Sequence, residues 1–476
     1  MIKQKNDIIL TGLIISPVTN LVQTIFRLLI MLNRSVFRYC ICLTLILLFS
    51  NFSFAQNKNK ASDTLTDDYY GIPGIRYEDF VYSPSIKSVQ LRDENFEISQ
   101  PLINLNGPER LKLSFDELDA DYKNYAFTYI HCNSNWEPSN LMPIEYIDGF
   151  QENLINEYKY SYNTLQRYVH YNAYFPGSAS RFTLSGNYIL KVYENGNPDN
   201  IIITKRFMVF QNKINIMPKI TRVSDAVYNN YNQEIDFTIN STGYEITNPY
   251  SDLKVVITQN NRWDNAKTNL KPLFVKNDEM IFELSKDNVF PGGNEFRHMN
   301  TKSIRYRSDQ YSKIVKDTAN ITHIYMVADQ KRSFKQYAFE SDLDGNFLIK
   351  NQDGDNSEVD ADYCYVHLFL PFDVLFNDGD FYVFGGFNGW RCDPQNKMKY
   401  NGKYLGYEAT LFLKQGYYDY EYAFLKDGTH TADETIVEGT HYETENTYTI
   451  YVYHKPLNKF YEQLIGVQKI TTTGAY

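Results

Sequence analysis

Short apolar or aromatic runs, each closed by a turn signal, recur along this chain and restrict it to a fold of many short strands. The clearest example is Ser185–Phe210. Residues Tyr188–Tyr193 alternate with a period of two, Asn195-Gly196 offers the positive φ of a tight turn, and Ile201–Phe210 returns. This pattern predicts a hairpin that closes a β-sandwich. The sequence shows no heptad, long amphipathic helix or short-period repeat.

Further runs of this kind divide the chain into three units. At 476 residues the chain is too long for one core, and a prior of about 150 residues per domain suggests three. We therefore predict an all-β protein of consecutive immunoglobulin-like or early-set sandwiches. The predicted boundaries are an N-terminal sandwich at 70–212, a middle sandwich at 213–357, a C-terminal early-set-like sandwich at 358–456 and a tail at 457–476.

Several segments carry specific expectations. The middle sandwich is expected to include strands at His323–Ala328 and Gln336–Glu340, and Tyr448–Tyr453 is expected to complete the C-terminal sheet. Asn153–Tyr168 is the one stretch expected to be helical or a long loop. Within the tail, Phe460–Val467 is expected to be a short amphipathic piece.

The aromatic composition also favours strands. The chain has 41 Tyr and 31 Phe against 3 Trp. Tyrosine suits half-buried pleated surfaces, where its ring packs and its hydroxyl reaches water. The formal net charge of -10 argues against a nucleic-acid-binding protein, because such a protein needs a concentrated basic face.

Residues 1–55 have the pattern of a leader with a signal peptide. Arg34 and Arg38 form a positive region, Tyr39–Phe49 is an apolar run, and Ser53-Phe54-Ala55 offers the small residues that a signal peptidase reads. A retained transmembrane anchor is the alternative, but the apolar run is short for a bilayer span of about 20 residues. We therefore expect cleavage after this tripeptide and no membrane span in the mature chain.

Two further features concern the N-terminal region. Met31 stands immediately before the positive region and is an alternative start, in which case residues 1–30 are an upstream extension. Residues 56–69 are polar and are expected to form a flexible linker.

Three cysteines remain after the leader: Cys132, Cys364 and Cys392. An odd and sparse set does not form a disulfide framework. We expect these thiols to be buried as small hydrophobic groups, while a Cys364–Cys392 pair stays open.

The sequence contains no recognisable catalytic motif. The eight histidines are scattered without metal-site spacing, and no nucleophile elbow, phosphate-binding loop or dinucleotide fingerprint occurs. A glycosidase needs only two facing carboxylates, which one sequence leaves open. We predict that the protein is not an enzyme and has no catalytic residues, cofactor or metal.

Acidic clusters have a plain interpretation. Asp342–Asn346 and Asp353–Asp360 contain the oxygen ligands that calcium prefers, but neither keeps the order of a helix–loop–helix site. We interpret them as turns with solvated carboxylates, and calcium binding there stays open. The same interpretation is given to Asp116, Glu117, Asp119 and Asp121.

The C-terminal unit contains the most informative motif. Tyr382–Trp390 is followed by Lys414–Tyr422 and by the Asp-Gly turn of Lys426–Gly428. This order resembles the early-set sandwich that carries starch- and glycogen-binding modules. In sugar-binding members two aromatic rings form a platform. Trp390 matches the first ring, but Thr429-His430-Thr431 stands where the second normally follows. The predicted ligand or partner contacts are Trp390, Phe387 and Asn388.

A set of turn and strand motifs is spread over nearly the whole mature chain. They are Tyr69–Pro73, Thr128–Trp136, Phe175–Gly177, Ser185–Tyr193, Asp342–Asn346 and Lys414–Tyr418. With these motifs the sequence resembles the type IX secretion system plug protein family of Bacteroidota. Because the motifs are structural, they identify a family better than a site.

The resemblance implies a periplasmic, non-enzymatic protein that closes the periplasmic opening of a giant outer-membrane β-barrel translocon. The translocon is then the expected partner, the protein is held at the outer membrane through it, and no small-molecule ligand is expected. The alternative is a carbohydrate-binding protein that uses the Trp390 region. A third hypothesis, an unrecognised hydrolase, rests only on the abundance of carboxylates.

Overall fold

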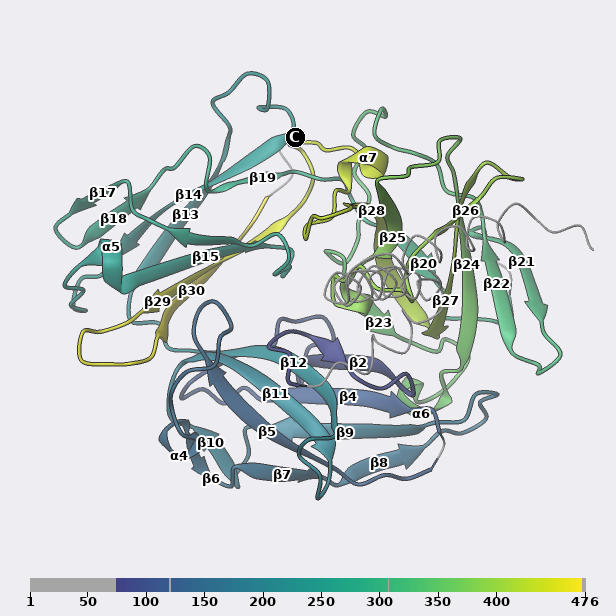
Figure 1. Ribbon diagram of the computed structural model, residues 1–476, viewed down its shortest axis with the longest axis horizontal. Coiled ribbons are helices and arrows are strands. Elements are labelled where there is room, and N and C mark those ends of the chain that lie inside the picture. Colours follow the sequence, from purple (N-terminus) through teal and green to yellow (C-terminus); the bar gives the residue numbers. More distant parts are fainter. Residues whose placement is uncertain (1–73, 120, 307, 473–476) are drawn as a thin grey trace, which may run out of the picture. The chain divides into compact units, whose positions relative to one another are not determined.

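The computed structural model describes residues 74–119, 121–306 and 308–472, which form β-strands joined by turns and single-turn helices (Figure 1). The described helices are α4 (Pro143–Tyr146), α5 (Pro249–Asp252), α6 (Ser357–Asp360), α7 (Thr435–Glu438) and the 3-10 turn η1 (Gly386–Asn388). The prediction of an all-β fold is confirmed. The predicted leader and linker lie outside the described residues. Among the described residues, no helix is long and apolar enough to cross a membrane.

The first sandwich packs two sheets around one core. One sheet has the order β1 (Phe80–Val81), β12 (Ile201–Phe210), β11 (Gly186–Glu194), β5 (Tyr125–Cys132), β7 (Glu152–Ile155), with β3 (Leu102–Asn104) also on β12. The other has the order β2 (Ile86–Asp93), β4 (Leu111–Glu117), β9 (Val169–Phe175), β8 (Glu157–Tyr160), and a two-stranded sheet pairs β10 (Ser180–Phe182) with β6 (Ile147–Gly149).

The predicted hairpin is confirmed as β11 and β12. Their antiparallel pairing runs from Gly186 opposite Val209 to Tyr193 opposite Ile201. Gly196 in the turn has φ +83°, a conformation that favours glycine. Tyr188 and Leu190 enter the sandwich core, whereas Ile189 faces a second core on the other side of the sheet. The strand is therefore buried on both faces.

The second sandwich is built from segments far apart in the sequence. One sheet has the order β13 (Asn215–Arg222), β14 (Asn232–Asn240), β18 (Glu279–Phe282), β17 (Phe274–Lys276), with β19 (Val289–Pro291) also on β14. The other has the order β16 (Lys267–Leu270), β15 (Leu253–Gln259), β29 (Thr447–His454), β30 (Gln463–Thr471). The yellow C-terminal strands thus lie beside the teal β15 (Figure 1).

The third sandwich takes strands from both sides of the predicted boundary at residue 357. One sheet centres on β28 (Gly416–Lys426), which pairs with β20 (Arg297–Asn300), β23 (Phe347–Ile349) and β25 (Gly379–Phe384). The other has the order β21 (Tyr311–Lys316), β22 (Thr322–Met326), β24 (Tyr363–Pro371), β27 (Gly406–Lys414), β26 (Lys399–Asn401).

Four strand assignments from the sequence are wrong. Tyr448–Tyr453 pairs with β15 and completes the second sandwich, not the C-terminal sheet. The segment expected as a tail with an amphipathic piece forms β30, paired along its length with β29. The strand at His323–Ala328 pairs in parallel with β24 of the third sandwich, and Gln336–Glu340 forms no strand. Local alternation marks these residues as strands, but distant partners decide the sheet that each one joins.

Asn153–Tyr168 is also corrected, since it contains strand β8 and most of β7 rather than a helix. The three thiols are free, with Cys132 and Cys364 buried and Cys392 half-buried. The domain boundaries stay predictions, because the described residues pack as one unit. A shared core holds the first and second sandwiches together, with Ile189 and Met208 on one side and Val256 and Tyr451 on the other.

Candidate functional site

The turn that carries the predicted contact residues follows strand β25. Asn388 fixes it, because its Nδ2 donates to the Val383 carbonyl at 2.8 Å and its Oδ1 accepts from the Gly385 N–H at 3.3 Å. Phe387 lies edge-on to the buried Tyr418, with ring centroids 5.9 Å apart. Two of the three predicted residues therefore make contacts inside the sandwich.

The Trp390 ring is half-buried among other side chains. It lies 5.4 Å from the Phe384 ring and 5.7 Å from the Phe296 ring, and the Arg262 guanidinium carbon lies 4.8 Å from its centroid. A Cβ built on Gly345 would stand 2.2 Å from the Trp390 ring, so only glycine permits this approach. The prediction that Trp390 contacts a ligand or partner stays a prediction.

The structure brings together two motifs that the sequence analysis singled out, one at Asp342–Asn346 and one at Tyr382–Trp390. The Gly386 N–H donates to the Gly345 carbonyl at 2.8 Å, so the Asp342–Asn346 turn packs on the Gly386–Trp390 turn. Behind them, Arg262 is buried and pairs with Glu421 at 3.1 Å and Asp264 at 2.7 Å. These contacts tie the loop after β15 to the third sandwich.

A buried cluster of charges joins the first sandwich to the third. We call Asp116, His170, Tyr363 and Lys414 the junction cluster. The Lys414 ammonium lies 2.7 Å from Asp116 Oδ2, with both side chains at most 1% exposed. The other carboxylate oxygen of Asp116 lies 2.6 Å from His170 Nδ1, and the Tyr363 hydroxyl donates to Oδ2 at 2.7 Å.

The environment of the junction cluster holds its carboxylate ionised. Burial alone would raise the pKa of Asp116, but the charge of Lys414 and the hydrogen bond to His170 hold that pKa below its usual value. The interpretation of Asp116 and Glu117 as solvated turn carboxylates is wrong, since both are buried in β4. A single sequence hides this role because the cation lies 298 positions away.

A second ion pair flanks the junction cluster. Lys112 Nζ lies 2.5 Å from Glu358 Oε1, which joins strand β4 to helix α6. Burial would raise the pKa of Glu358, but the hydrogen bond from Lys112 and the nearby His170 lower it to about 2. Asp116 and Glu358 at this junction therefore each have a cationic partner.

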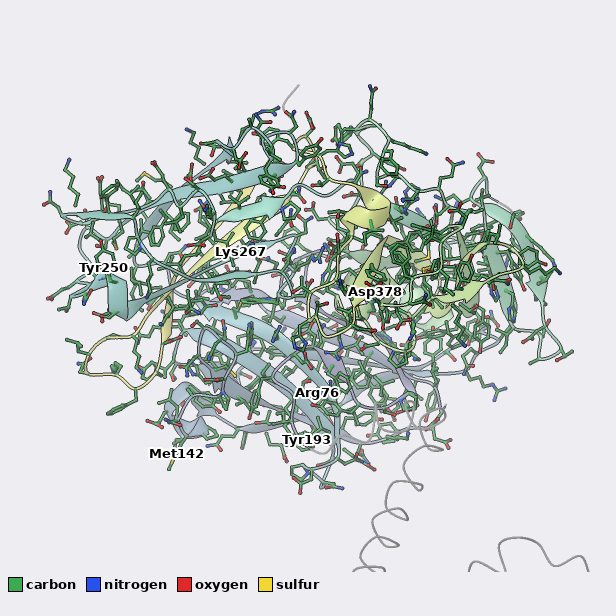
Figure 2. All side chains as sticks on the ribbon, turned by 45° about the horizontal axis from the view of Figure 1, so that its top comes forward. Arg76, Met142, Tyr193, Tyr250, Lys267 and Asp378 are labelled. Atoms are coloured by element: carbon green, nitrogen blue, oxygen red, sulfur yellow. The ribbon has the colours of Figure 1, made fainter. Side chains whose placement is uncertain are left out.

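A different margin of the first sandwich is open to solvent. We call residues 142–160 the exposed edge; they run through α4, β6, β7 and β8 along the lower rim of this sandwich (Figure 1). Among the described strands, β7 and β8 each end the order of their sheet. Met142, at the lower margin of Figure 2, is 70% exposed, Ile144 is 73% exposed and Phe150 is 69% exposed. Leu154, Tyr158 and Tyr160 are also exposed.

Neighbouring residues hold the exposed edge in place. Tyr146 is buried and its hydroxyl donates to the Tyr129 carbonyl at 3.0 Å, while Ile147 and Ile155 enter the sandwich core. The segment has four carboxylates and one lysine, so its apolar side chains stand in an acidic setting. The sequence analysis missed this surface, because a single sequence does not show which apolar residues are exposed and which are buried.

Comparison with known proteins identifies the family to which this chain belongs. Residues 86–211 match the family model described as the type 9 secretion system plug protein 1st domain. Among solved structures, the chain is similar to a hypothetical protein from Parabacteroides merdae, with 34% sequence identity and a TM-score of 0.81. The similarity covers 84% of this chain and 100% of that one. The chain belongs to the type 9 secretion system plug protein family. No curated protein matches the sequence.

Membership assigns this plug-family protein a role in type IX secretion. The matched first domain contains the exposed edge and, in Asp116 and His170, half of the junction cluster. Its remaining members, Tyr363 and Lys414, come from the third sandwich. The family domain therefore has one margin that holds the rest of the chain and one that faces solvent.

Proposed function

We propose that this protein is a non-enzymatic periplasmic plug that binds and closes the periplasmic opening of a giant outer-membrane β-barrel translocon. It stays at the outer membrane through this partner. The observation that carries the proposal is the family match over residues 86–211. A solved relative of 34% identity supports it, because its similarity covers 84% of the chain.

The proposal assigns docking to the exposed edge. Exposed apolar patches beside the ends of sheets are typical of protein–protein contacts, and an edge strand offers unpaired backbone groups to an added strand. Ile144 and Phe150 supply the apolar contact area, and the strands β7 and β8 supply the backbone groups.

A plug must also keep its shape while it closes a pore, and the buried ion pairs between the sandwiches support this requirement. Buried ion pairs at Lys414–Asp116 and Arg262–Glu421 join segments that are far apart in the sequence. Breaking such a pair leaves an uncompensated charge, which costs about 3–5 kcal/mol. Relative movement of the sandwiches is therefore costly.

The experiment that tests the proposal is affinity purification of the tagged protein from detergent-solubilised cell envelopes, followed by mass spectrometry. We expect a stoichiometric outer-membrane β-barrel among the co-purified proteins. Recovery of the protein alone, together with retention on a polysaccharide column, would overturn the plug and favour the carbohydrate-binding alternative.

A further inference from the structure

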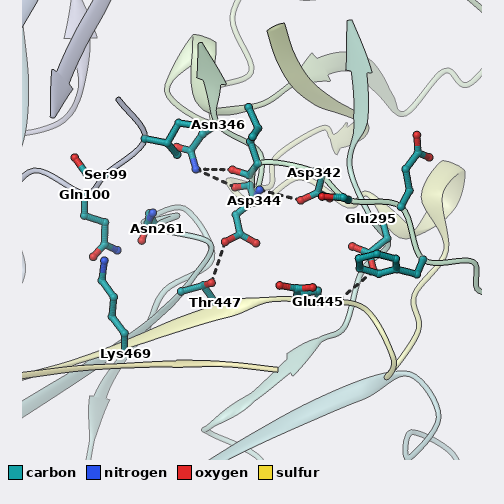
Figure 3. A pocket seen from close by; sticks show the side chains of 15 residues that line it. Ser99, Gln100, Asn261, Glu295, Asp342, Asp344, Asn346, Glu445, Thr447 and Lys469 are labelled. Carbon is teal, nitrogen blue, oxygen red and sulfur yellow. Dashed lines mark hydrogen bonds between the residues drawn. The ribbon is translucent and has the colours of Figure 1, made fainter. Parts of the chain in front are cut away.

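An acidic pocket of about 390 Å³ lies where segments of all three sandwiches meet (Figure 3). Ser99 and Gln100 come from the first sandwich, and Thr447 and Lys469 from strands of the second. The Asp342–Asn346 turn, which leads into the third sandwich, forms another wall. The volume falls at the lower end of the range for ligand sites.

Carboxylates dominate the lining of the pocket. Glu295, Glu340, Asp342, Asp344 and Glu445 line it, with Lys469 as the cation among its described lining residues. Asp342 accepts the N–H groups of Phe296 and Asp344 at 2.6 and 2.9 Å, and the Thr447 hydroxyl donates to Asp344 at 2.9 Å. The hydrogen-bond partners of both carboxylates are neutral donors, and the Lys469 charge acts on Asp344 from within the pocket.

The electrostatics differ from those of the junction cluster. Burial raises the pKa of Glu295 to about 7 and that of Asp342 to about 6. The carboxyl of Asp419, which accepts N–H groups from the back of the same turn, has its pKa raised to about 8 by burial and by Asp342. Burial and neighbouring carboxyls raise these pKa values, so a cation that enters the pocket would stabilise the ionised form of each carboxyl.

A buried hydrogen-bond acceptor without a described partner, the Gln100 Oε1, is a separate sign that the pocket binds a ligand. Gln100 is 6% exposed and lines the pocket. Its Nε2 donates to Thr449, but its Oε1 has no hydrogen-bond partner among the described residues. The Asn261 Oδ1 on the same wall is a second buried acceptor without a described partner. A buried acceptor left in this way costs free energy, which a donor in the pocket would recover.

The arrangement suits an organic cation better than a metal ion. Among the described residues, no group of three or more His, Cys, Asp or Glu side chains could hold a metal ion. The acceptors are instead spread along the pocket, from Gln100 and Asn261 to Glu295. A guanidinium presents five N–H donors in one plane and sheds its weak hydration easily, whereas an ammonium is a compact point charge.

We propose that this pocket binds a guanidinium group, with Asp344 as its charged partner and the Gln100 carbonyl as a neutral acceptor. The chemistry is the same whether the group belongs to an arginine side chain of a bound protein or to a free small molecule. The pocket shares no lining residue with the exposed edge, so this site is independent of the proposed docking to the barrel.

Isothermal titration of the full chain tests the site with three probes: agmatine, the peptide Gly-Arg-Gly and the peptide Gly-Lys-Gly. We expect Gly-Arg-Gly to bind at least about fivefold more tightly than Gly-Lys-Gly, because only the guanidinium reaches several acceptors. Tighter binding of agmatine than of Gly-Arg-Gly assigns the site to a free molecule. The reverse order assigns it to an arginine within a chain.

Two variants keep the test independent of folding. Asp344→Asn preserves a residue that tolerates the observed φ of +51°, and it should weaken Gly-Arg-Gly binding about tenfold. Gln100→Met keeps a similar side-chain length without adding a buried charge, removes the Oε1 acceptor and should weaken Gly-Arg-Gly binding. Asp380→Asn, on an exposed carboxylate outside the pocket, is the matched control. The proposal is overturned if no probe binds up to about 10 mM, or if Asp344→Asn behaves like the control.

Discussion

At the margin where the first sandwich meets the third, Asp116 and Glu358 pair with buried lysines, whereas along the exposed edge apolar side chains are open to solvent. Asp116 has Lys414 at 2.7 Å, while Ile144 and Phe150 are 73% and 69% exposed. Both margins belong to the domain that the family model matches. The difference indicates that one set of residues is committed to holding the chain together and the other is available to a partner.

The largest effect should come from breaking the junction cluster. Lys414→Met leaves Asp116 charged and buried, so we expect the free energy of unfolding to fall by about 3–5 kcal/mol. Denaturant unfolding followed by tyrosine fluorescence measures this change. Lys426→Met, at an exposed ion pair with Asp378, is the control and should cost about 0–1 kcal/mol. Equal losses in the two variants would contradict the structural role of the cluster.

A smaller loss is expected at the turn that the sequence marked for ligand contact. Trp390→Ala removes a half-buried ring that packs on Phe384, Phe296 and Arg262, and should lower the free energy of unfolding by about 2–4 kcal/mol. Retention on immobilised glycogen is measured beside stability. A variant that unfolds like the wild type but loses polysaccharide retention would make Trp390 a binding residue and contradict its role in packing.

The ion pair between Lys112 and Glu358 predicts that the stability of the protein depends on pH. The pKa of Glu358 is lowered from 4.5 to about 2, so its contribution to stability is present above pH 4.5 and is lost as the pH falls towards 2. Glu358→Gln should therefore unfold at lower denaturant than the wild type at pH 7, and the two should converge at about pH 2. Unfolding midpoints measured every half unit check this. A constant difference at all pH values would remove the ionised carboxylate from the explanation.

The strands could be predicted from the sequence because side-chain alternation and turn residues are local signals. The β11–β12 hairpin is the clearest case, since Asn195-Gly196 lies between its strands. The sheet that each strand joins was not predictable. Strand β29, for example, pairs with β15 although all the strands of the third sandwich lie between them in the sequence. Long-range pairing depends on the shape of the complete core.

The same limit applies to the candidate sites. From the sequence, Asp116 was interpreted as one carboxylate of an acidic turn. Only the fold brings the Lys414 ammonium next to it. Part of the exposed edge lies in Asn153–Tyr168, which the sequence predicted to be helical or a long loop. Its exposure depends on β7 and β8 each ending the order of its sheet. The Asp342–Asn346 turn is visible as an acidic motif, but its neighbours Gln100 and Thr447 come from distant segments.

The most direct test of the central claim compares barrel binding by two matched double variants. Ile144→Ser with Phe150→Ser alters the exposed edge, and Leu457→Ser with Phe460→Ser removes two apolar side chains of somewhat greater exposure from another surface. Both should stay within about 0.5 kcal/mol of the wild type in stability, because the side chains lie at the surface. We predict that the first variant loses co-purification of the β-barrel and the second retains it. Undiminished recovery of the barrel with the first variant would contradict docking through the exposed edge.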